Sequence, residues 1–318
     1  MWRVGIDEAG YGPNLGPMVM ACAACHVPGD APADLWAVLG RAVRKKCRGK
    51  DPRLLIDDSK KVHDGKDACA KLERGVLAML SLAGTLPQLL SELLDNRSAA
   101  DSIVELLAEP WYRPATPLPV FDTVENVTAA GTALGEACQE ANVAWAPPRV
   151  MVVPAPRFNA MLDVHKLKSE VEIVGIKHLF AALLALPGDD PVHVAVDRLG
   201  GRLNYGPLLQ EVFADGWVRV IKESAEACDY AVYGLGRELH FHFQPKADGD
   251  FLCVALASMT AKYLREAFMA QFNKYWADLV PGVKPTAGYP LDALRFLNDI
   301  HPTLAARGIA MESVWRRK

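Results

Sequence analysis

The sequence has no long hydrophobic run. Its longest apolar stretch, HLFAALLALP at positions 178–187, is well short of the about 20 residues that a membrane-spanning helix needs. Positions 1–10, MWRVGIDEAG, contain acidic residues where an export signal has its apolar segment. We therefore expect a cytoplasmic protein with no membrane partner.

Cysteine is present, but not in the pattern of a disulfide-stabilised protein. The seven cysteines are odd in number and widely scattered, which argues against a disulfide framework. Cys22 and Cys25 precede His26 in the C-x-x-C-H spacing of haem attachment. The surrounding run, MVMACAACHV, is also typical of a buried strand. Because haem attachment requires export, we expect core thiols and no haem.

The net charge of −3 favours no class of partner by itself. Positions 41–66, however, carry ten basic and four acidic residues, so the rest of the chain is acidic. A basic segment on an acidic protein is typical of a phosphate-binding surface. It is equally typical of the solvated face of a helix and its following loop. Charge alone does not choose between these two interpretations.

The pattern of hydrophobic residues indicates a mixed α/β fold. The 318 residues, of which 51% are hydrophobic and 23% charged, can form a sizeable core without metal or disulfide support. We predict strands at 2–7, 18–27, 150–154, 192–197, 217–221 and 238–243, and helices at 33–47, 72–80, 168–186 and 251–279. Between 84 and 148, short helical pieces alternate with proline-rich stretches.

Several acidic residues end a predicted strand or follow it directly. Asp7 and Glu8 close the first strand, Asp197 closes the strand at 192–197, and Asp248 lies before the long helix. Strand ends are where sites gather in α/β folds. Converging carboxylates repel each other unless a cation lies between them, and hard oxygen ligands suit Mg²⁺ or Mn²⁺. A single acid at a strand end can also be a simple turn residue, and spacing alone does not bring these four together.

Four segments resemble, in the same order, the motifs of the type 2 ribonucleases H. They are GIDEAGYGPNLGP at 5–17, DSKK at 58–61, KAD at 246–248 followed by ASMTAKYLRE at 257–266, and GYP at 288–290. The resemblance implies a ribonuclease-H-like α/β fold, with a mixed five-stranded sheet flanked by helices. It also implies a catalytic domain at 1–280, with an insertion at about 84–148, and a C-terminal helical segment at 281–318 packed on it.

The resemblance implies that Asp7, Glu8, Asp197 and Asp248 are catalytic and bind the metal ions. Asp248 is preferred over Asp250 because it keeps the family's spacing to the AK pair at 261–262. The implied activity depends on Mg²⁺ or Mn²⁺. It hydrolyses the RNA strand of RNA–DNA hybrids, or ribonucleotides embedded in duplex DNA, by a two-metal mechanism that leaves 3′-hydroxyl and 5′-phosphate ends.

The resemblance also implies a set of substrate-binding residues. The lysines would contact backbone phosphates, which position a duplex without reading its sequence. The glycine turn would lie near the 2′-hydroxyl of the ribonucleotide, and the late tyrosine would stack on the neighbouring sugar. The implied residues are Gly10, Tyr11, Gly12, Ser59, Lys60, Lys61, Lys262 and Tyr289.

Three departures from the family pattern indicate a distinct branch. Tyr11 stands where the family usually has arginine or lysine between the two glycines, which leaves the recognised nucleotide open. About 50 residues separate Asp197 from Asp248, more than the family's usual connection. The last residues, RGIAMESVWRRK, have no clear match to the family's ending.

Other functions stay open beside this one. The chain could be a catalytically weak relative that binds nucleic acid and recognises the shape of a hybrid or a junction. It could also be a nuclease of the same fold with another polynucleotide substrate, since one fold supports several chemistries. His240 and His242 share a face of a predicted strand and could bind a metal, but no third ligand has a recognisable spacing. The GGR sequence at 200–202 could bind phosphate or form a plain turn.

Overall fold

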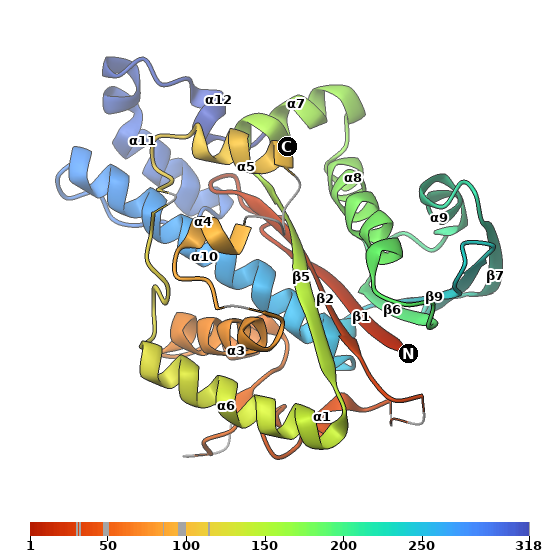
Figure 1. Cartoon of the computed structure of the whole chain (residues 1–318). Helices are drawn as coiled ribbons and strands as arrows, with labels where there is room; N and C mark the ends of the chain where they lie inside the picture. Colours follow the sequence, from red (N-terminus) through yellow and green to blue (C-terminus); the bar gives the residue numbers. More distant parts are fainter. Residues whose placement is uncertain are drawn as a thin grey trace.

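The structure is a computed structural model, and it describes residues 1–29, 31, 33–46, 51–84, 86–94, 100–113 and 115–317. In these ranges, no helix is both long enough and apolar enough to cross a membrane. Figure 1 shows a central twisted sheet with helices packed on both of its faces.

The central sheet is mixed, and its strands follow the order β5-β2-β1-β6-β9-β8-β7. Strand β1 pairs in parallel with β6, and β6 pairs in parallel with β9, whereas the other neighbouring pairs are antiparallel. The strands are β1 (Trp2–Ala9), β2 (Met18–His26), β5 (Ala144–Val153), β6 (Val192–Asp197), β7 (Trp217–Glu223), β8 (Cys228–Tyr233) and β9 (Leu239–Gln244). The predicted mixed α/β layer fold is confirmed.

The predicted number of five strands is wrong, because β7 and β8 extend the sheet beyond β9. These two strands form an antiparallel hairpin within the long connection between Asp197 and Asp248. The same connection also contains α9 (Gly206–Val212). The additional residues of this connection therefore form two further strands of the sheet.

Alternate side chains of β2 face opposite layers of helices, as expected for a strand that is buried on both faces. Ala21 and Cys25 pack with α3 (Ala68–Leu82), α6 (Val124–Ala141) and α10 (Leu252–Leu279). Met20 and Cys22 pack with α7 (Ala155–His165), α8 (Lys168–Ala181) and α9. Cys22 and Cys25 are thus buried on opposite faces of a strand, and the strand predicted around them is confirmed.

Helix α10 lies directly against β1, and Gly5 makes this close approach possible. A Cβ atom placed on Gly5 would lie 2.0 Å from the backbone nitrogen of Val254. The helix predicted at 251–279 is confirmed, with bounds of Leu252–Leu279. The first turn of α10 therefore lies against the middle of β1.

The helix predicted at 33–47 is wrong. Helix α1 covers only Leu35–Val38, capped by Asp34, and the chain turns after Leu39. A short two-stranded sheet follows, in which β3 (Val43–Arg44) pairs with β4 (Leu54–Leu55). Leu35, Leu39 and Val43 are all buried nevertheless. The spacing of apolar residues predicted burial here, but not the conformation of the backbone.

The segment at 84–148 covers the α10 side of the sheet. It contains α4 (Leu90–Leu94), α5 (Ala100–Leu107), α6 and the first residues of β5. Leu93, Trp111 and Leu134 are buried in the same cluster as α10. The segment supplies core side chains; its origin as an insertion stays a prediction.

The C-terminal residues return to the N-terminal glycine turn. Helix α11 (Pro290–Ala306) places Phe296 and Ile300 in the α10 cluster, and α12 (Met311–Val314) follows it. Leu15 and Trp315 then form an isolated β-bridge. The C-terminal residues therefore lie beside the turn that joins β1 to β2, at the end of the sheet away from the N-terminus (Figure 1).

Candidate active site

Four of the predicted site residues lie at the carboxyl end of the parallel strands. Asp7 and Glu8 are near the end of β1, and Ile6 is paired with Val196, so Asp197 ends the neighbouring strand beside them. Asp248 lies in the short helix η2 (Ala247–Gly249), just before α10. The backbone N–H of Ala247, the residue before Asp248, donates to Asp197 Oδ1 at 3.3 Å. Three elements that are far apart in sequence therefore bring acids to one edge of the sheet.

Asp7 and Glu8 affect each other's protonation. Asp7 is only 6% exposed, and burial, followed by the charge of Glu8, raises its pKa well above the usual range. A hydrogen bond from Ser258 of α10 acts in the opposite direction. Burial also raises the pKa of Glu8, and the charge of Asp197 adds to that effect. These carboxylates occupy a shared, poorly solvated space.

A further acid, Asp58, belongs to the same group. Burial, followed by the charges of Asp58 and Asp197, raises the pKa of Asp248 to about 6. Asp58 is the N-cap of α2 (Ser59–Val62), where its carboxylate accepts from the N–H of Lys60 at 2.9 Å. Asp58 begins the DSKK motif, so its sequence position could have identified it as a site residue.

Glu172 of α8 approaches the group from the opposite layer of helices. It is 3% exposed, and burial, followed by the charges of Glu8 and Asp197, raises its pKa to about 8. Tyr11 lies between these groups: burial, then the charges of Glu172 and Glu8, raises its pKa. No motif contains Glu172, and its only signal in the sequence is an acid among the apolar residues of a buried helix face.

The chemistry of this donor set fits Mg²⁺ or Mn²⁺, because every candidate ligand is a hard carboxylate oxygen. The carboxylates raise one another's pKa values, and a divalent cation would relieve that repulsion. They are not closely gathered around one point. Among the described residues, the one group of three candidate ligands whose atoms all lie within 4.8 Å is His63, Cys69 and Glu266.

The glycine turn and the late tyrosine are neighbours, as the substrate-binding prediction requires. A Cβ on Gly12 would lie 3.9 Å from Cε1 of Tyr289, whose residue is 53% exposed. The carbonyl of Gly288 accepts from the N–H of Asn14 at 2.8 Å. Gly10 has φ +87°, and a Cβ there would lie 2.8 Å from Nε of Arg265, so this position requires glycine.

Two buried arginines brace this turn. Arg265 Nη2 donates to the carbonyl of Leu15 at 3.1 Å and to that of Ala287 at 2.9 Å. Arg316 Nη2 donates to the carbonyl of Gly10 at 2.6 Å and also to that of Pro13. Arg316 is fully buried, and burial lowers its pKa to about 9.

Both arginines were missed from the sequence. Arg265 lies in the ASMTAKYLRE motif, which was a usable signal, whereas the chain end that contains Arg316 matches no family motif. The C-terminal residues nevertheless support the glycine turn directly.

Of the serine and lysines predicted to bind substrate, some lie at the acid group and others form ion pairs within the protein. Ser59 Oγ is hydrogen-bonded to Ser258 Oγ at 3.0 Å, and the charge of Lys60 acts on Glu8 and Asp248, so both residues lie at the acid group. Lys61 pairs with Asp57, at 3.1 Å, although the charges of Asp58 and Asp248 also act on it. Lys262 pairs with Glu266 one helical turn further along α10, at 2.7 Å.

Much of the basic segment at 41–66 is neutralised within the protein. Arg41 pairs with Glu140, and Arg53 pairs with Asp51 at 2.7 Å. Lys45 lies over the ring of Trp36. Arg48 and Lys50 lie outside the described residues. These contacts favour the solvated-face interpretation for most of the segment, while Lys60 remains beside the acids.

The two histidines of β9 and Arg202 of the GGR turn contact polar groups within the protein. His242 contacts Asp229 at 2.6 Å through Nδ1 and Gln244 at 2.8 Å through Nε2, and His240 contacts Glu238 at 3.2 Å. Neither histidine belongs to a group of three candidate metal ligands in the described ranges. The GGR turn at 200–202 places Arg202 against Glu170, at 3.2 Å.

Comparison with known proteins gives similarities of fold at low sequence identity. No family model matches the sequence, and neither does any curated protein. The chain is similar to ribonuclease HII of Archaeoglobus fulgidus, in its complex with PCNA, with a TM-score of 0.43 and 17% identity over 100% of this chain and 95% of that one.

Two further solved structures are similar at the same level. Ribonuclease H2 from Pyrococcus horikoshii OT3 has a TM-score of 0.47 and 15% identity over 99% of this chain and 92% of that one. Bst-RNase HIII in complex with Mn²⁺ has a TM-score of 0.47 and 16% identity over 99% of this chain and 66% of that one.

Proposed function

We propose that this protein is a divalent-metal-dependent endonuclease. Its substrate would be the RNA strand of RNA–DNA hybrids, or ribonucleotides embedded in duplex DNA. The observation that carries the proposal is the meeting of Asp7, Glu8, Asp197 and Asp248 at one edge of the sheet, beside a glycine turn and an exposed tyrosine. The ordered motifs of the sequence point to the same reaction.

The four acids would hold the metal ions, with Asp58 close enough to Asp248 to act on its charge. Bound Mg²⁺ or Mn²⁺ would supply Lewis acidity and an activated water for phosphodiester hydrolysis. Ser258 would orient Asp7 through its hydrogen bond, and Ser59 would hold the Ser258 hydroxyl from the other side.

The glycine turn and its neighbours would position the substrate. Gly12 has no side chain, and of the described residues only Tyr289 lies within 4 Å of its Cβ position, so a sugar–phosphate backbone could approach its peptide groups closely. Tyr289 is exposed beside Gly12 and would stack on a sugar or base. Lys60 would contact a phosphate near the acids. We also propose that residues 1–280 form the catalytic domain and that residues 281–318 pack on it and brace this turn.

The test is cleavage of three end-labelled duplexes by the whole chain. One duplex contains a single ribonucleotide, the second is a full RNA–DNA hybrid, and the third is all DNA. Each is incubated with Mg²⁺, with Mn²⁺ and with a chelator. We expect metal-dependent cleavage only of strands that contain ribose, with 3′-hydroxyl and 5′-phosphate ends. Equal cleavage of the all-DNA duplex would contradict the proposed substrate.

A second candidate function is nucleic-acid binding without turnover. Two observations favour it: Tyr11 replaces the usual cation of the glycine turn, and the four acids are not closely gathered around one point. In that case the hybrid would bind with or without Mg²⁺, and no duplex of the three would be cut.

A further inference from the structure

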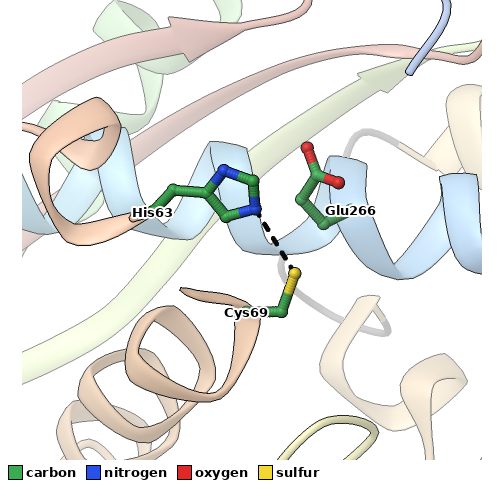
Figure 2. Close-up of side chains that lie close together, drawn as sticks. All are labelled: His63, Cys69 and Glu266. Carbon is green, nitrogen blue, oxygen red and sulfur yellow. Dashed lines mark hydrogen bonds between the residues drawn. The ribbon is translucent and has the colours of Figure 1, made fainter. Parts of the chain in front are cut away.

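His63, Cys69 and Glu266 form a compact group on the face of α10 that is turned toward α2 and α3. His63 is the C-cap of α2, Cys69 lies in the first turn of α3, and Glu266 belongs to α10. One ligand atom of each lies within 4.8 Å of those of the other two, and all three residues are half-buried. Figure 2 shows the imidazole, the thiol and the carboxylate directed toward a common space.

We propose that these three side chains bind a Zn²⁺ ion, at a site separate from the carboxylate group. An imidazole nitrogen and a thiol sulfur are ligands that Zn²⁺ prefers, whereas Mg²⁺ selects oxygen. With Zn–S and Zn–N bonds of about 2.3 and 2.0 Å, a tetrahedral site places sulfur and nitrogen about 3.5 Å apart. His63 Nε2 lies 3.4 Å from Cys69 Sγ.

Without a metal ion, these three side chains already contact other groups, and a bound ion would have to replace those contacts. The His63–Cys69 contact is itself a hydrogen bond, and Lys262 holds Glu266 at 2.7 Å. The Zn²⁺ ion would replace that hydrogen bond and displace Lys262 from the carboxylate. Ion pairs of this i,i+4 kind contribute little to stability, so the loss is small beside zinc coordination.

The site would join three helices beside the proposed active site. Ser59 of α2 already contacts Ser258 of α10. His63 lies four residues after Ser59, and Glu266 lies eight residues after Ser258, so the zinc ion would link the same two elements further along. Cys69 would add α3. Zinc would therefore fix α2, which carries Lys60, against α10; this inference does not depend on the reaction.

The test is a titration of the whole chain with Co²⁺, followed by Zn²⁺, without Mg²⁺. We expect one Co²⁺ per chain to give a thiolate-to-cobalt absorption band, which one equivalent of Zn²⁺ abolishes; Co²⁺ held by the carboxylate group would give no such band. Zinc should also raise the unfolding temperature. Cys69→Ser should remove the band and the rise in temperature, while Asp7→Asn, at the other site, should keep both.

A milder variant tests the site if Cys69→Ser folds poorly. Glu266→Gln should keep the thiolate band and weaken Co²⁺ binding by at least about tenfold. Absence of a thiolate band in the wild-type chain, or a band that survives Cys69→Ser, would overturn the proposal. Unchanged Co²⁺ affinity in Glu266→Gln would remove Glu266 from the site.

Discussion

Two buried carboxylates of this protein, Glu73 and Asp7, have opposite environments. Glu73 of α3 is fully buried and accepts from the backbone N–H groups of Val120, Phe121 and Asp122 at 2.5 to 2.8 Å. The hydroxyl of Tyr263 donates to it as well, at 2.8 Å. Asp7 is almost as buried, but its neighbours include other carboxylates, and its hydrogen bonds come from the Glu8 N–H and Ser258.

The difference teaches which of the two carboxylates is structural. Four donors converge on Glu73, so its charge is satisfied within the fold and ties α3 to α10 and to the segment before α6. Asp7 is placed where neighbouring charges oppose its ionisation. Burying like charges together costs stability, and the arrangement is useful when a cation joins them.

The largest expected effect is the loss of turnover caused by Asp7→Asn. Loss of one metal ligand should cost several kcal/mol of transition-state stabilisation, and so reduce turnover by at least about a hundredfold. The metal-free variant should unfold at the same temperature as the wild type or higher, because one repelling charge is gone. Cleavage rates and thermal unfolding of the two proteins measure this. An active Asp7→Asn variant would contradict the assignment of Asp7.

The same chemical change at Glu73 should act on stability. In Glu73→Gln, the amide NH₂ faces buried N–H donors, and we expect the free energy of unfolding to fall by about 3 kcal/mol. Denaturant unfolding of Glu73→Gln beside Asp7→Asn is the measurement. Equal stability of the two variants would remove the distinction between a structural and a functional carboxylate.

A smaller effect is expected at the exposed tyrosine of the glycine turn. Stacking on one base or sugar is worth about 1–3 kcal/mol, so Tyr289→Ala should reduce cleavage of a single-ribonucleotide duplex by about 5- to 150-fold. Leu291 is 88% exposed two residues later and is the matched control. Leu291→Ala should leave the rate unchanged; an equal loss in both variants would show a general disturbance of the turn.

The smallest effect concerns Glu109, a buried acid that, among the described residues, has neither the hydrogen-bond donors of Glu73 nor the neighbouring acids of Asp7. Its Oε1 has no hydrogen-bond partner in the described part of the chain, and burial raises its pKa from an ordinary 4.5 to about 8. Between these two pH values the unfolded chain releases the proton that the folded chain keeps, so stability falls as the pH rises.

Glu109→Gln should remove that dependence. The free energy of unfolding of the variant minus that of the wild type should increase by about 1 kcal/mol or more from pH 5 to pH 8, and should then stay constant. Thermal unfolding at both pH values measures it. Glu105→Gln, which changes an exposed acid nearby, should show no such gain. A gain for Glu109→Gln that is the same at pH 5 and pH 8 would contradict the raised pKa.

The sequence predicted the layers of the fold better than its local turns. The period of apolar residues sufficed for α10, which lies within one residue of its expected start. The same period failed at 33–47, because Val43 is buried through pairing with Leu54 rather than on a helix. Of the seven strands of the central sheet, the residue pattern predicted all but β8, which pairs with β9.

The candidate site was predictable where short motifs carry it. Asp7 and Asp248 lie in such motifs, Asp197 was found because it ends a strand, and the structure places the three at one edge of the sheet. Glu172 and Arg316 were not, because their proximity to the site depends on how α8 and the chain end pack. Contacts between distant segments of this kind leave no periodic pattern in the sequence.

The most direct test compares two acids that lie two residues apart. Asp248 faces Asp58 and Asp197, whereas Asp250 is exposed and accepts from Gln244 Nε2 at 2.7 Å. Cleavage of a single-ribonucleotide duplex should be lost in Asp248→Asn and kept in Asp250→Asn, with both variants folded. Full activity in Asp248→Asn would contradict the proposal that the carboxylates at this edge of the sheet form the catalytic metal site.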